Sequence, residues 1–171
     1  MTDMPLADLP AGADESSWLA ACAAVRRYCG WHIAPSVTET LTLDGPGGTL
    51  LRLPSAYVTA VTSVANGGTA IDDPDWSAHG MIRARCWTEK FRGVVVELTH
   101  GYDQCPEDLL DVLVHMAAQG QAAASAGAGI ATSLTSGPFT MQVSAAAQAG
   151  AVGLSGQHRG VLNKYRLGPT P

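Results

Sequence analysis

Apolar residues recur at spacings of three and four in two separate parts of the chain. The first stripe consists of Trp18, Ala21, Cys22, Val25, Tyr28 and Cys29. It predicts a helix within 14–30, which Asp14 can cap and Gly30 can end. The second stripe consists of Leu109, Val112, Leu113, Met116, Ala117 and Gly120. It predicts a helix within 105–126, opened by Pro106 and by acidic residues in its first turn.

Between these helices the apolar period changes from 3.6 to 2. Residues 37–43 alternate apolar with polar side chains, and the alternation resumes at 49–53 after the glycine-rich segment 44–48. We therefore expect a hairpin there. Further strands are predicted at 57–64, 81–87 and 93–99. Five or six short antiparallel strands in a curled sheet or sandwich would fill residues 33–102.

The resulting fold class is α+β. It is a small helical bundle with a β-rich antiparallel insertion between the first and second helices, followed by a long uncharged loop or hairpin (127–153) and a short C-terminal helix within 154–171. The chain has 171 residues, enough for one domain with a real core. We expect a single domain over 1–171.

Charge is distributed unevenly along this chain. Charged residues make up 15%, against about 25% in typical globular proteins. Residues 112–158 contain no Asp, Glu, Lys or Arg at all. Such a stretch must be buried, inserted in a membrane, disordered or covered by another chain. No uninterrupted run of about 20 apolar residues exists, which argues against a membrane span.

The net charge of −5 argues against a protein that wraps nucleic acid, since that function needs clustered Lys and Arg. The N-terminal sequence has no basic and apolar regions of the secretory type. We therefore expect a cytoplasmic setting in which the four cysteines stay thiols.

Candidate chemistry is sparse. Cys22 and Cys29 are two possible metal ligands, but two small core residues on a buried stripe are the favoured interpretation. His115 is interpreted as a packing residue more readily than as a general base. The acidic segment 72–75 lacks the pattern of a calcium loop, and the glycines of 44–48 lack the pattern of a phosphate-binding loop. We predict no catalytic, cofactor-binding or metal-binding residue.

The order of several short motifs is more informative than any one of them. These motifs are Ala24–Pro35, Leu51–Ser55, Val58–Val61, Val95–Tyr102, Cys105–Leu110 and Leu162–Arg166. In this order the chain resembles the head-to-tail adaptor (head–tail connector) proteins of long-tailed bacteriophages, especially those that infect actinobacteria. The likeness covers roughly residues 14–167, and His100-Gly101-Tyr102 followed by Pro106 is its most specific part.

The resemblance implies a structural virion protein without catalysis or cofactor. Adaptors of this family form an oligomeric ring, commonly a dodecamer, below the portal protein at the neck of the virion, after assembly in the host cytoplasm. The oligomeric ring extends the channel through which genomic DNA passes without sequence-specific binding, and it offers a surface to the stopper, head-closure or tail-completion protein. Another neck component is the alternative, and a small metal-dependent enzyme is a more remote one.

Two sets of contact residues follow from chemistry and family layout. Portal docking is predicted for Arg159, Val161, Leu162, Lys164, Tyr165 and Arg166. The alternative for this segment is a helix that packs on its own subunit. Contact between subunits is predicted for the uncharged segment, through Ile130, Leu134, Phe139, Met141, Val143 and Ala146. The alternative there is a loop that does not pack.

Overall fold

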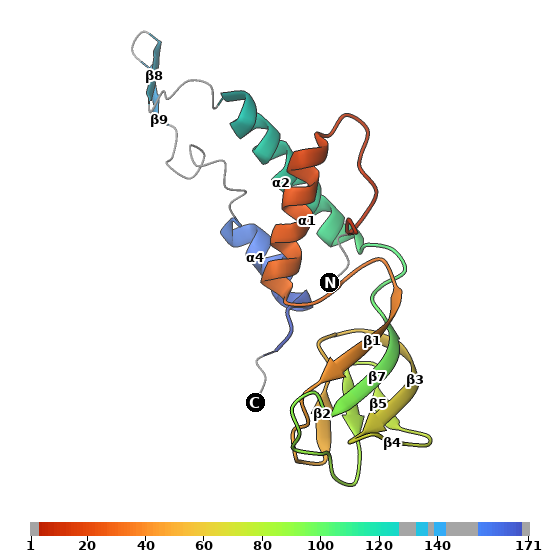
Figure 1. The fold of residues 1–171 in the computed structure, drawn as a ribbon. Coiled ribbons are helices and arrows are strands. Elements are labelled where there is room, and N and C mark those ends of the chain that lie inside the picture. The colour runs from red at the N-terminus through yellow and green to blue at the C-terminus, as the bar shows by residue number, and fades with distance from the viewer. Residues whose placement is uncertain (1–3, 127–132, 137–138, 143–153, 169–171) are drawn as a thin grey trace. The chain divides into compact units, whose positions relative to one another are not determined.

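A helix, a run of strands, a long helix and a short C-terminal helix follow one another along the chain, as Figure 1 shows. The computed structural model describes residues 4–126, 133–136, 139–142 and 154–168. Its first helix is α1 (Glu15–Cys29) and its second is α2 (Glu107–Ala126). Helix α4 (Gly156–Leu162) leads into a short 3-10 helix, η1 (Asn163–Tyr165). The predicted α+β fold class is confirmed.

Three antiparallel sheets are present in the described part of the chain. The strands are β1 (Val37–Leu43), β2 (Leu50–Arg52), β3 (Val58–Asn66), β4 (Thr69–Ala70), β5 (Asp75–Ser77), β6 (Met81–Arg83), β7 (Val94–His100), β8 (Ser133–Ser136) and β9 (Phe139–Gln142). The first sheet has the order β1-β7-β3-β4 and the second the order β2-β6-β5, while β8 and β9 pair as a separate hairpin.

These described residues form two compact units. The β unit comprises Met1–Ala7, Cys29–Pro106 and Tyr165–Pro171, and the helical unit comprises Asp8–Tyr28 and Glu107–Lys164. The core of the β unit draws on both larger sheets, with Leu51 and Ile82 from one and Val64, Val96 and Leu98 from the other. The sandwich-like arrangement expected for 33–102 is therefore present.

The predicted hairpin between 37–43 and 49–53 is wrong. Strand β1 pairs along its whole length with β7, from Val37 opposite His100 to Leu43 opposite Val94, whereas β2 pairs with β6 in the other sheet. Both β1 and β7 have seven residues, so their pairing satisfies more backbone groups than the three-residue β2 offers. Strand β6 also ends at Arg83, earlier than expected, and β4 and β5 bring the strands of residues 33–102 to seven.

The helical unit buries the predicted stripes. Trp18, Ala21, Cys22 and Val25 of α1 are buried, as are Leu109, Val112, Leu113, Met116 and Ala117 of α2. Asp14 caps α1, because its carboxylate accepts hydrogen bonds from the Ser17 backbone N–H (2.8 Å) and the Ser16 hydroxyl (2.5 Å). These contacts hold the pKa of Asp14 below its ordinary value. None of the helices described combines the length and apolarity needed to cross a membrane.

Candidate docking surfaces

The C-terminal segment begins with a capped helix. The Ser155 hydroxyl accepts a hydrogen bond from the His158 backbone N–H at 3.2 Å and so starts α4. His158 and Leu162 are buried on one side of α4, while Arg159 is exposed on the other. This alternation gives α4 one face that packs on its own unit and one that faces solvent.

Part of the predicted portal-docking set packs within the chain itself. Leu162 is fully buried, and Val161 and Tyr165 are half-buried. The Leu162 side chain is thus a core residue of the helical unit, a correction to its expected place on a docking surface. The reason is its position one helical turn after His158, which puts both side chains on the inner face of α4. Only the basic residues of the set, Arg159, Lys164 and Arg166, are exposed.

Two polar contacts join the residues after α4 to other parts of the helical unit. The Tyr28 hydroxyl donates a hydrogen bond to Oδ1 of Asn163 at 2.7 Å. Lys164 Nζ lies 3.8 Å from a carboxylate oxygen of Asp108, with 69% of the Lys164 side chain exposed. Such an exposed ion pair contributes little to stability. Lys164 therefore keeps most of its charge available to solvent.

Within the β unit, the residues after Lys164 pack against the segment that follows α1. The Leu167 backbone N–H donates a hydrogen bond to the Cys29 carbonyl oxygen at 2.9 Å. The Tyr165 side chain meets Tyr102 edge-on, with ring centroids 6.2 Å apart, and Tyr102 stacks on Tyr57 at 4.4 Å. This packing favours the alternative in which the segment lies on its own subunit, at least for its apolar members.

His100-Gly101-Tyr102, the most specific part of the resemblance, forms a tight turn at the end of β7. Strand β7 ends at His100, and Gly101 follows with a φ of 95°. The Gly101 N–H donates to the Tyr57 carbonyl oxygen (2.9 Å), and the Tyr102 N–H donates to that of Ile33 (2.8 Å). A Cβ on Gly101 would lie 3.1 Å from the Pro35 carbonyl oxygen. The sequence motif is therefore a tight junction between three segments of the β unit.

His100 at this junction is buried and lies 2.9 Å from the Glu39 carboxylate through its Nε2 atom. The partner carboxylate comes from β1, whose Glu39 lies opposite Leu98 in the sheet. Buried polar side chains usually have at least one hydrogen-bond partner, and for the His100 Nε2 atom that partner is Glu39. We assign this pair a structural role in joining β1 to β7.

The two cysteines named as possible metal ligands are both buried, Cys22 in the helical unit and Cys29 in the β unit. Burial raises the pKa of the Cys29 thiol to about 11, with Arg166 acting in the opposite direction. A thiol that keeps its proton is a poor nucleophile. Within the described residues, no three His, Cys, Asp or Glu side chains are grouped as a metal site would require.

His115 is exposed on α2, so its interpretation as a packing residue is wrong. It falls between the buried positions Leu113 and Met116, so the buried stripe of α2 does not include it.

The glycine-rich segment 44–48 supports the loop before β7. Gly45 N–H donates to the Lys90 carbonyl oxygen at 3.0 Å. A Cβ on Gly45 would lie 1.9 Å from the Thr88 carbonyl oxygen, so only glycine allows this approach.

Half of the predicted subunit contacts, namely Ile130, Val143 and Ala146, lie outside the described residues. Leu134, Phe139 and Met141 belong to the β8–β9 hairpin, in which Leu134 lies opposite Met141 and Ser136 opposite Phe139. The predicted loop or hairpin of 127–153 thus contains a paired hairpin. The role of this segment in subunit contact stays a prediction.

Known proteins match this chain through its three-dimensional structure. Neither a protein-family model nor a curated protein sequence matches the chain. A chain in the neck of a native gene transfer agent (GTA) particle, computed with C12 symmetry, matches with a TM-score of 0.54 and 17% identity, over 91% of this chain and 82% of that one.

Two further structures are similar. A chain in the neck of an empty GTA particle, computed with C6 symmetry, has a TM-score of 0.48 and 18% identity, over 97% of this chain and 86% of that one. A chain of the native GTA virion has a TM-score of 0.49 and 18% identity, over 94% and 81%. At 17% identity, the likeness to the chain in the C12-symmetric neck shows a shared fold, and it extends over 91% of the present chain.

Proposed function

We propose that this chain is a structural protein of the neck of a phage-like particle, and within the neck the head-to-tail adaptor. In this role it forms an oligomeric ring below the portal protein, extends the DNA channel and offers its other face to the stopper or tail-completion protein. The observation that carries the proposal is the shared fold with a GTA neck chain over 91% of the present chain. The order of sequence motifs from Ala24 to Arg166 supports the same role independently.

The electrostatics of the chain support a channel function. Its net charge is −5, and a channel wall that DNA must slide past should not bind phosphate tightly.

The described residues also lack a grouped metal site, and burial favours the protonated form of the Cys29 thiol. We therefore propose a structural role without catalysis.

The portal-docking surface that we propose contains fewer residues than the set predicted from the sequence. It uses the exposed basic residues Arg159, Lys164 and Arg166 and the half-buried Val161. Leu162 is buried and Tyr165 packs on Tyr102, so neither is part of the proposed docking surface. Arg159 is the residue of choice for a test, because it lies in the last turn of α4 and on its exposed side.

The experiment is binding of the full chain to portal-bearing, tailless capsids of its own particle, measured by co-sedimentation. Arg159→Glu should weaken binding about tenfold, a loss of about 1.4 kcal/mol, and binding of the unaltered chain should weaken as salt rises. Arg27→Glu is the matched control, because Arg27 is also exposed and also lies in the last turn of a helix of the same unit. Deletion of 159–171 is unsuitable, since it removes the buried Leu162.

The second candidate function is another neck component, namely a stopper or tail-completion protein. The matching GTA structure is of a neck, so the shared fold favours a neck position in general. Imaging of the assembled particle separates the two functions. Density of this chain directly against the portal supports the adaptor, and density below a second oligomeric ring supports the other component and contradicts the adaptor.

A further inference from the structure

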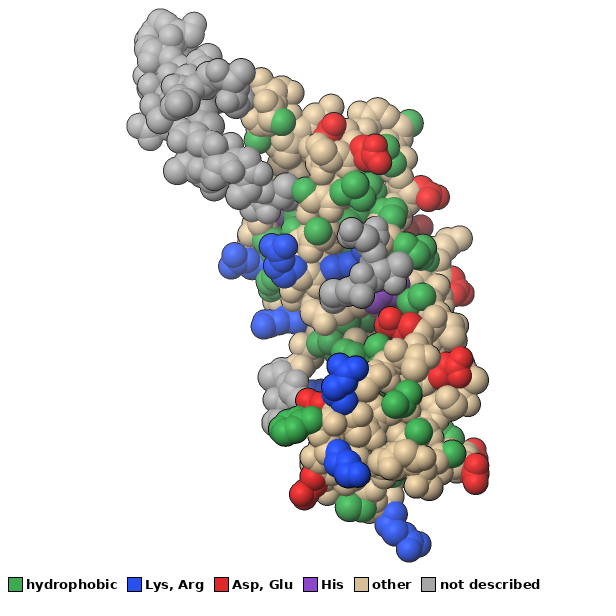
Figure 2. All heavy atoms as spheres, viewed as in Figure 1, with side chains coloured by type: hydrophobic (Ala, Val, Ile, Leu, Met, Phe, Trp, Pro, Cys, Tyr) green, Lys and Arg blue, Asp and Glu red, His purple; other side chains and the backbone are tan. Residues whose placement is uncertain are grey.

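Phe91 is the most exposed of the large apolar side chains that the structure describes, with 87% of its surface accessible. It lies in the loop between β6 and β7 and is flanked by Lys90 and Arg92, which are also exposed. On the face shown in Figure 2, basic and apolar side chains both project from the β unit. We call Lys90, Phe91 and Arg92 the basic knob.

The backbone of the basic knob is held from both sides. The Arg92 N–H donates to Oδ1 of Asp44 at 2.7 Å, and the Gly93 N–H donates to the Lys90 carbonyl oxygen at 3.1 Å. The Lys90 carbonyl also accepts the Gly45 N–H. The backbone on both sides of Phe91 is therefore held in place, so that little backbone conformational entropy would be lost when Phe91 binds.

Arg92 adds a second unusual feature. Its φ is 52°, in the left-handed region that favours glycine. Strained non-glycine residues of this kind are concentrated at binding and switch sites. Here the strained position carries a positive charge directly beside an exposed phenyl ring.

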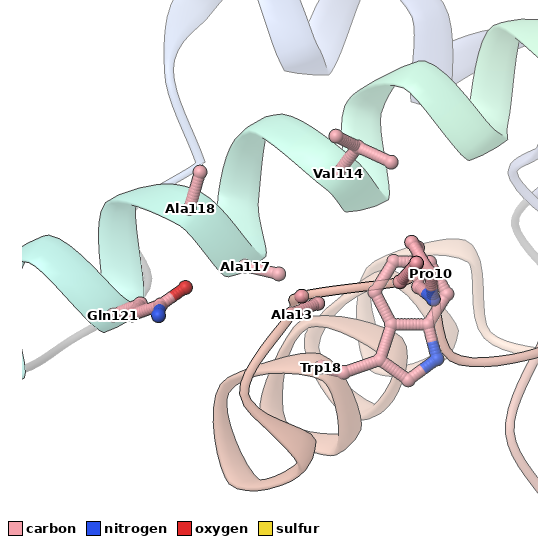
Figure 3. A pocket seen from close by; sticks show the side chains of 9 residues that line it. Pro10, Ala13, Trp18, Val114, Ala117, Ala118 and Gln121 are labelled. Atoms are coloured by element: carbon pink, nitrogen blue, oxygen red, sulfur yellow. The ribbon is translucent and has the colours of Figure 1, made fainter.

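The helical unit contains a pocket large enough for a phenyl ring. It has a volume of about 190 Å³ and is lined by residues 10–13, Trp18, Val114, Ala117, Ala118 and Gln121. In Figure 3, Ala117 points from α2 toward Ala13. We call this the Trp18 pocket, because Trp18 is its largest and most buried lining residue. An apolar cavity of roughly 150 Å³ accommodates benzene, so the Trp18 pocket has room for one phenyl ring.

The basic knob and the Trp18 pocket also lie in segments of opposite charge. Residues 83–92 contain four basic residues and one acidic residue, namely Arg83, Arg85, Lys90, Arg92 and Glu89. The segments that line the Trp18 pocket, 8–18 and 107–121, contain no Lys or Arg and six acidic residues: Asp8, Asp14, Glu15, Glu107, Asp108 and Asp111. Complementary charges of this kind steer and orient two surfaces.

We propose that the basic knob of one copy of this chain inserts Phe91 into the Trp18 pocket of a second copy. Each copy then has one knob and one pocket, so the contact is heterologous and can repeat from copy to copy around a closed oligomeric ring. The inference deepens the proposed function, because it names a contact of the oligomeric ring, and it rests on that function. Phe91 would be the central aromatic anchor of a larger interface.

The test is photo-crosslinking with the full chain. Phe91 is replaced by p-benzoylphenylalanine in one preparation, which is mixed with an isotopically labelled second preparation and irradiated. We expect adducts between light and heavy chains that map to 10–18 or 114–121. Ala118→Trp in the labelled copy should fill the pocket and lower the adduct yield about tenfold. Ala20→Trp is the matched control, because Ala20 is exposed on α1 and does not line the pocket.

A charge swap extends the test. Arg92→Glu in the photoreactive chain should lower the yield, and Asp111→Arg in the labelled chain should restore part of it. Adducts confined to a single copy, adducts that map elsewhere, or an unchanged yield with Ala118→Trp would each overturn the proposed contact. An adduct formed only with a different neck protein on capsids would also overturn it.

The two proposals can fail separately. If adducts form in the Trp18 pocket but the chain does not bind portal-bearing capsids, the contact between copies stands and the neck function falls. If Phe91→Ala assembles on capsids as well as the unaltered chain does, the neck function stands and the contact falls.

Discussion

The indole N–H of Trp31 donates a hydrogen bond to the backbone carbonyl oxygen of Tyr165, with 2.6 Å between the two atoms. Trp31 follows α1 directly and is 1% exposed, whereas Tyr165 lies near the other end of the chain. Both rings also meet Tyr102, at centroid distances of 6.3 and 6.2 Å. Tyr165 is thus tied to the core of the β unit through the buried Trp31.

Trp31→Phe should lower the free energy of unfolding by about 1–3 kcal/mol, because it leaves the Tyr165 carbonyl without its donor in a partly buried place. Chemical denaturation followed by circular dichroism measures the loss. Trp87→Phe is the matched control: Trp87 is equally buried, and its indole N–H has no hydrogen-bond partner among the described residues. Equal losses in the two variants would show that ring volume, not the hydrogen bond, decides the effect.

Leu162→Ala should destabilise the chain by about 2–5 kcal/mol, because it opens a cavity at a fully buried leucine. Val161→Ala, one residue earlier and half-buried, should cost clearly less. Urea denaturation of both variants tests this. If the two lost the same small amount of stability, Leu162 would be a surface residue and would again be available for docking.

Gly101→Ala should destabilise the chain by about 1–3 kcal/mol, because alanine is strained at a φ of 95° and its Cβ would meet two carbonyl oxygens. Gly160→Ala provides the contrast. Gly160 lies inside α4, and a Cβ added there would have no other atom within 4 Å, so alanine should stabilise the helix by up to about 1 kcal/mol. Thermal melts of both variants should shift in opposite directions, and shifts in the same direction would contradict the local geometry.

Alkaline pH should destabilise the protein through Cys29. Burial raises the pKa of this thiol from 9.0 to about 11, so between these values the unfolded chain releases the proton while the folded chain keeps it. Ionisation then favours the unfolded state, and the free energy of unfolding falls by up to about 3 kcal/mol as pH rises through this window. Below pH 9 the contribution is constant.

The measurement is the difference in urea stability between the unaltered chain and Cys29→Ala at pH 8 and at pH 11. Cys29→Ala should lose less stability over this range, and Cys86→Ala, at an exposed cysteine, should behave like the unaltered chain. A pH dependence that Cys29→Ala leaves unchanged would assign the alkaline effect to other groups.

The sequence by itself determined the elements whose signals are local. The stripe from Trp18 to Cys29 and the stripe from Leu109 to Ala117 predicted α1 and α2 because residues three and four apart share one helix face. Asp14 marked a helix start because its side-chain oxygen can accept a backbone N–H, and Pro106 marked another because its fixed φ suits the first helical position. The alternation at 93–99 likewise predicted β7.

Only the tertiary structure decided which strands pair and which side chains are covered. Strand β1 (Val37–Leu43) pairs with β7 and not with β2, which is nearer in the sequence. The reason is that the partner of an antiparallel strand can lie far away along the chain. Leu162 and Phe91 are both large and apolar, yet one is fully buried and the other 87% exposed. The burial of a side chain depends on which distant residues pack against it. The residue type at that position does not reveal those neighbours.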